Sequence, residues 1–123
     1  MALPALVFCD TTFFYACLNP KDANHTRARI LVAESASAGT TWCATGDIVS
    51  ETVTLLRYRR NFRAALAFLS DVKPWLQIVP DARDHRLSFC DAISCIVVTS
   101  LLNHAPCFTF DEDFRRLGLT VLP

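Results

Sequence analysis

The sequence has no excess of charge: 12 lysine and arginine residues balance 12 aspartate and glutamate residues in a chain of 123 residues. The net charge of the protein therefore does not attract it to nucleic acid or to an anionic membrane. Binding to a polyanion would have to depend on a local patch or on bound metal ions.

Membrane and export signals are also missing. No run reaches the roughly 18 apolar residues that a membrane-spanning helix needs. The first nine residues contain no basic side chain, and Asp10 interrupts their apolar stretch, so a secretory signal is not indicated. We expect a cytoplasmic protein that has no membrane partner.

Metal-binding cysteine pairs are absent as well, since none of the six cysteines forms a Cys-x-x-Cys motif. The only close histidine–cysteine pair is His104 with Cys107, which is a weak zinc signal without a second pair. Most of the cysteines lie in apolar runs. This placement indicates small buried side chains in a reducing compartment.

The sequence does contain apolar segments of strand and helix length in alternation, with 52% hydrophobic residues overall. Strands are predicted at 5–9, 40–44, 75–79, 106–110 and 119–122. Helices are predicted at 12–18, 23–38, 47–60, 62–71 and 88–103, with a helical turn at 112–117. We expect Gly39 to end the second helix and Asp47 to cap the third. This order predicts one α/β domain over residues 1–123 with a mostly parallel sheet.

Four acidic residues fall where such a fold exposes functional groups. Asp10 and Asp111 directly follow the first and fourth predicted strands, and the carboxyl ends of parallel strands line the functional crevice. Glu51 and Asp91 occupy early turns of helices in apolar surroundings. Converging carboxylates repel one another, and a divalent cation such as Mg²⁺ would offset that repulsion. Metal-assisted phosphodiester hydrolysis is the chemistry that this group favours.

Each acidic residue also has a simpler interpretation. Asp10 could cap the helix that follows it, and Asp91 could belong to a capping box, because it lies three positions after a serine. Glu51 could be an ordinary helix-surface residue. Asp111 and Asp113 could be turn residues. Only the joint placement of these residues favours a metal site.

Two segments carry a family resemblance: Leu-Ser-Phe-Cys-Asp-Ala-Ile-Ser at 87–94 and Phe-Thr-Phe-Asp-Glu-Asp-Phe at 108–114. Together with Asp10 and the Glu51-Thr52 pair, they resemble PIN-domain ribonucleases over nearly the whole chain. The single-domain length is similar to that of the VapC-type toxins of type II toxin–antitoxin systems.

The resemblance implies a three-layer α/β/α sandwich and a Mg²⁺- or Mn²⁺-dependent endoribonuclease. It also implies an RNA substrate, an antitoxin partner that inserts a segment into the acidic pocket, and a homodimer. The implied catalytic and metal-binding residues are Asp10, Glu51, Asp91 and Asp111, with Asp113 as a further metal carboxylate and Thr109 as an auxiliary hydroxyl.

The sequence departs from the family pattern in one place. Family members of this type usually carry an additional helix between the third strand and the Ser-Phe-Cys-Asp segment, where this chain has only residues 80–87. The departure affects the expected substrate groove and dimer surface but not the four acidic positions.

Two other functions stay open. A PIN-like module that binds RNA or protein without catalysis would have the same fold. An aspartate-dependent phosphatase would usually need a second aspartate two residues after Asp10, where this sequence has Thr12, and a lysine deeper in the chain. The basic stretch at 57–63 could contact RNA phosphates, although a solvated helix end is the favoured interpretation.

Overall fold

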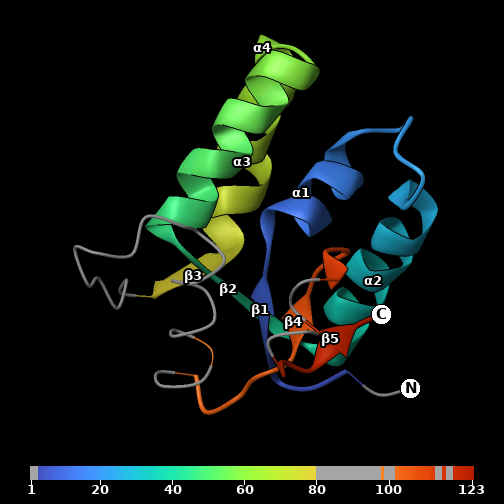
Figure 1. The fold of residues 1–123 in the computed structure, drawn as a ribbon, viewed down its shortest axis with the longest axis vertical. Helices are drawn as coiled ribbons and strands as arrows, with labels where there is room; N and C mark the ends of the chain where they lie inside the picture. Colours follow the sequence, from blue (N-terminus) through green and yellow to red (C-terminus); the bar gives the residue numbers. More distant parts are fainter. Residues whose placement is uncertain (1–2, 80–97, 99–101, 113–114, 116–117) are drawn as a thin grey trace.

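The computed structural model describes residues 3–79, 98, 102–112, 115 and 118–123. In this part of the chain, five parallel strands form one sheet in the order β3-β2-β1-β4-β5 (Figure 1). The strands are β1 (Leu6–Cys9), β2 (Thr41–Thr45), β3 (Leu76–Val79), β4 (Cys107–Phe108) and β5 (Val121–Leu122). The first strand is therefore the central one, with β2 on one side and β4 on the other.

Two helices connect β1 to β2, and two helices with two short turns connect β2 to β3. They are α1 (Thr11–Leu18), α2 (His25–Ala38), α3 (Gly46–Arg59) and α4 (Phe62–Ala67), followed by a π-helical turn, η1 (Phe68–Val72), and a 3₁₀ turn, η2 (Lys73–Trp75). Figure 1 shows α1 beside α2, while α3 and α4 extend together beyond the end of the sheet. The predicted helix at 62–71 is thus α4 continued by η1, and the predicted helix at 88–103 lies outside the described residues.

Capping residues define where the helices begin and end. Gly39 ends α2 in the left-handed conformation with φ of 68°, as predicted. The prediction that Asp47 caps α3 is wrong, because the Thr45 side chain accepts the Ile48 amide at 3.2 Å. Asp47 lies in the first turn instead, where a negative charge still favours the helix dipole.

The central strands β1 and β4 are buried on both faces of the sheet. Trp42 of β2 and Phe108 of β4 project to one face, where Phe13 of α1 lies 4.9 Å from Phe108 and 5.3 Å from Trp42 between ring centroids. The parallel register puts Phe8, Cys43 and Cys107 on the opposite face, and all three are fully buried. A parallel sheet buried on both sides is the centre of a layered α/β fold, so the predicted fold class is confirmed.

The described cysteines behave as buried side chains. Cys9, Cys17, Cys43 and Cys107 are free thiols in the core, as predicted, and Cys90 and Cys95 lie outside the described residues. Burial raises the pKa of the Cys17 thiol to about 12 and that of Cys43 to about 11, which keeps both thiols protonated and unreactive. None of the described helices has the length and apolar character needed to cross a membrane.

Candidate active site

Asp10 lies at the carboxyl end of the central strand. Its backbone amide donates to the Phe108 carbonyl at 3.0 Å, which continues the pairing of β1 with β4 by one residue. Its side chain caps α1 by accepting from the Thr12 amide at 3.3 Å. Asp10 is only 3% exposed, so a strand end and a helix start together bury one carboxylate at the rim of the sheet.

Two threonine hydroxyls converge on this carboxylate. Thr12 Oγ1 and Thr109 Oγ1 each donate to Asp10 Oδ2 at 2.9 Å, and the two hydroxyl oxygens are 3.0 Å apart. Each hydroxyl in turn accepts a backbone N–H: Thr12 from Phe110 at 2.9 Å, and Thr109 from Asp111 at 3.0 Å. Because these amides occupy acceptor positions of the hydroxyls, the hydroxyl protons are directed at Asp10.

The electrostatics of Asp10 reflect opposing effects. Burial raises the pKa of its carboxyl group, while the hydrogen bonds from Thr109 and Thr12 lower it. Burial is the larger cause, so the net pKa is above the ordinary aspartate value. A buried anion of this kind favours the binding of a cation.

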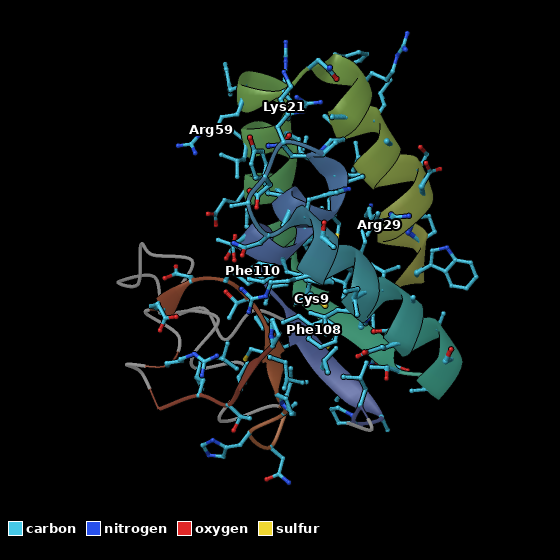
Figure 2. All side chains as sticks on the ribbon, turned by 90° about the vertical axis from the view of Figure 1, so that its right-hand side faces the viewer. Cys9, Lys21, Arg29, Arg59, Phe108 and Phe110 are labelled. Atoms are coloured by element: carbon cyan, nitrogen blue, oxygen red, sulfur yellow. The ribbon has the colours of Figure 1, made fainter. Side chains whose placement is uncertain are left out.

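Asp111 follows Thr109 by two residues and is half-buried. It lines a small pocket of about 210 Å³ that Thr109 also lines. The hydrogen bonds of Thr12 and Thr109 hold Asp10 close to the chain segment that carries Asp111. Figure 2 shows Cys9, Phe108 and Phe110 grouped at this junction between the blue β1 and the orange C-terminal strands.

Glu51 differs from the sequence prediction in its environment. The apolar residues around it suggested a carboxylate in apolar surroundings, but Glu51 is exposed on α3. The next residue, Thr52, is fully buried and its hydroxyl donates to Thr11 Oγ1 at 3.2 Å. This bond joins α3 to the first residue of α1, directly after Asp10.

Asp91 and Asp113 lie outside the described residues. Within the described ranges, no group of three or more histidine, cysteine, aspartate or glutamate side chains is arranged to hold a metal ion. The four-carboxylate metal site therefore stays a prediction. The described residues fit a hard cation in their chemistry, because a buried aspartate follows β1 and a half-buried aspartate lies three residues beyond the adjacent β4.

Thr12 is a site residue that sequence reasoning missed. The sequence showed Thr12 only as the residue at the position where a phosphatase would have its second aspartate. Its position two residues into a helix capped by Asp10 was the available signal, because a hydroxyl there can reach back to the cap. In the structure its hydroxyl donates to Asp10 Oδ2 at 2.9 Å.

The basic stretch at 57–63 ends α3 and begins α4. Arg57, Arg59 and Arg63 are exposed there. Figure 2 places Arg59 toward the end of the molecule where Lys21 lies, away from Phe110. The solvated helix end is therefore the interpretation that the structure favours.

Comparison with known proteins identifies the class. Residues 7–119 match the PIN domain family, and the chain belongs to that family. Among solved structures, it is similar to the Mycobacterium tuberculosis toxin VapC20, described as a toxin that cleaves the sarcin–ricin loop. The two share 27% sequence identity and a TM-score of 0.75 over 93% of this chain and 96% of that one. No curated protein gave a significant match. The predicted family and its resemblance to VapC-type toxins are confirmed.

Proposed function

We propose that this PIN-domain protein is a metal-dependent endoribonuclease that acts as the toxin of a toxin–antitoxin pair. The observation that carries the proposal is the buried carboxylate of Asp10. Thr12 and Thr109 donate hydrogen bonds to it, and Thr109 also accepts the backbone N–H of Asp111. The likeness to VapC20, a toxin that cleaves an RNA loop, supports RNA as the substrate.

Mg²⁺ or Mn²⁺ would be held by Asp10, Glu51, Asp91 and Asp111, with Asp113 as a further ligand. When bound, the ion activates water and offsets the charge that develops on the phosphodiester. The role of Thr109 and Thr12 is to fix the carboxylate of Asp10 before substrate arrives, which is the preorganisation that electrostatic catalysis requires. We propose in-line attack by water without a covalent enzyme intermediate.

The partners follow from the same family relationship. We propose a cognate antitoxin that inserts a segment into the acidic pocket, and a homodimer of this chain in the cytoplasm. Copurification with the product of a small neighbouring gene and light scattering on the purified protein would test the two assemblies separately.

The decisive experiment is RNA cleavage by purified protein with magnesium, and then with EDTA. Replacing Asp10→Asn or Asp91→Asn should abolish cleavage and leave the circular dichroism spectrum unchanged. The exposed Asp71→Asn provides a matched control that should retain full activity. Thr109→Val should lower kcat about 10- to 100-fold, because it removes one donor that positions Asp10.

The proposal fails if the Asp10→Asn and Asp91→Asn proteins cut RNA at the normal rate. If the unmodified protein binds RNA without cutting it under any divalent ion, the non-catalytic PIN-like module is the better description.

A further inference from the structure

The small pocket beside Asp111 contains two arginines that the proposed chemistry does not use. Its wall includes Thr109 and Asp111 from the candidate active site, Arg27 from the first turns of α2, and Arg115. The chain has no net charge, so an anion can be attracted to this site only by basic side chains that lie close to it.

Arg27 is held in place by contacts that leave its charge intact. Its guanidinium carbon lies 5.4 Å from the centre of the Phe110 ring, and its Nη1 donates to Asn24 Oδ1 at 3.3 Å. Both partners are neutral. The ring belongs to the residue directly before Asp111, so the cation is fixed next to the acidic segment.

Arg115 is also only weakly neutralised. Its Nη2 donates to the Pro123 carbonyl at 2.9 Å, and its Nε lies 3.8 Å from the Glu112 carboxylate. That ion pair is long and exposed, with 51% and 74% of the two side chains accessible, and such pairs contribute little. An arginine has five N–H donors, so Arg115 retains donors for a second anion.

We infer that Arg27 and Arg115 bind a backbone phosphate of the RNA adjacent to the one that is cut. A guanidinium matches the oxygens of a phosphate through paired hydrogen bonds. The carboxylates of Asp111 and Glu112 in the same pocket repel a phosphate, so the phosphate belongs at the arginine side while the acidic side is left to the metal. This inference rests on the proposed function, because it names a substrate contact of the same site.

The test measures RNA binding separately from cleavage. Binding of a fluorescein-labelled single-stranded RNA is followed by anisotropy in EDTA, which prevents cutting, at several salt concentrations. The variants are Arg27→Gln, Arg115→Gln and Arg27→Lys, each in the full chain. Arg29→Gln is the matched control, because Arg29 is exposed like Arg27, lies two residues further along α2 and lines a different pocket. Figure 2 shows Arg29 on the α2 and α4 side, away from Phe110.

Arg27→Gln and Arg115→Gln should each raise Kd about three- to tenfold. Each should also lower the slope of log K against log salt by about 0.7, the value for one phosphate contact on a single strand. Arg27→Lys should retain most of the salt dependence, since it keeps the charge, and Arg29→Gln should bind as the unmodified protein does. In magnesium, the two glutamine variants should raise KM more than they lower kcat.

The inference is overturned if Arg27→Gln and Arg115→Gln bind RNA as Arg29→Gln does, even when the protein cleaves RNA. It is also overturned if they weaken only the complex with a partner protein. If the protein never cleaves RNA but the two variants still lose affinity and salt slope, the phosphate contact stands and the proposed catalysis fails.

Discussion

Asp10 combines a structural and a chemical role in one side chain. As the N-cap of α1 it accepts the Thr12 amide, and as a buried carboxylate it receives hydroxyl protons from Thr12 and Thr109. The alternatives of a helix cap and a site residue, which the sequence left open, are therefore not exclusive. The same hydrogen bonds that start the helix also fix the orientation of the carboxylate.

The raised pKa of Asp10 gives a pH-dependent stability. Because burial raises the folded pKa above the unfolded value, the folded protein holds this proton more tightly, and stability falls as pH rises through the folded pKa. Asparagine caps a helix as well as aspartate does and carries no charge. In EDTA, Asp10→Asn should therefore melt at a higher temperature than the unmodified protein at neutral pH.

The difference between the two melting temperatures should shrink as the pH is lowered toward the ordinary carboxylate pKa. Thermal unfolding followed by circular dichroism measures it, and the exposed Asp71→Asn should show no such trend. A lower melting temperature for Asp10→Asn at neutral pH would contradict the role assigned to burial.

Individual residues also show the limits of sequence reasoning. The position of Asp10 directly after β1 could be predicted, because a strand end is a local property of the sequence. Asp111 was predicted to follow its strand directly, but β4 ends at Phe108, three residues earlier. The exposure of Glu51 could not be predicted, because its neighbours Ile48 and Thr52 turn to the interior while Glu51 turns to solvent. Arg27 gave no signal, since only the fold brings α2 against Phe110.

At the scale of elements, the orientation of α3 depends on one buried contact. The Thr52 hydroxyl donates to Thr11 across the junction of α3 with α1, and both residues are buried. A single Thr→Val change at either residue leaves one buried hydroxyl without its partner, at a cost of about 1–3 kcal/mol. The double variant Thr11→Val with Thr52→Val removes both polar groups and should be less destabilised than the sum of the single variants.

Urea unfolding of the four proteins gives the coupling free energy as a double-mutant cycle. Thr54→Val is the control, because Thr54 is exposed and its hydroxyl donates to the Ser50 carbonyl within the same helix. Additive single effects would mean that the two hydroxyls do not act together. RNA cleavage by the same variants would show how far the position of Glu51 depends on this contact.

The elements themselves could be predicted largely from apolar runs and turn residues. Strand β1 and the end of α2 at Gly39 follow local rules, and both are close to their predicted bounds. The cap of α3 could not be assigned from sequence, because Thr45 and Asp47 are both good capping residues. Pairing of β2 with β3 extends β2 to Thr45, opposite Val79, and this strand end decides between them.

At the scale of the whole molecule, metal binding should appear as added stability. An ion that binds only the folded protein stabilises it by about 2.7 kcal/mol at a concentration 100 times its Kd. Adding Mg²⁺ or Mn²⁺ to metal-free protein should thus raise the melting temperature, and Asp10→Asn or Asp111→Asn should lose that increase. Asp71→Asn should keep it, and an equal increase in all four proteins would exclude Asp10 and Asp111 as metal ligands.

The hydrogen bond between Thr109 and Asp10 joins residues that are 99 positions apart. During synthesis at about 5–20 residues per second, roughly 5–20 s separate the emergence of the two partners. A nascent or truncated chain that lacks β4 therefore cannot complete this network, however well its first strands fold. If the protein cuts RNA as proposed, its carboxylate at Asp10 is fully positioned only after β4 has been synthesised.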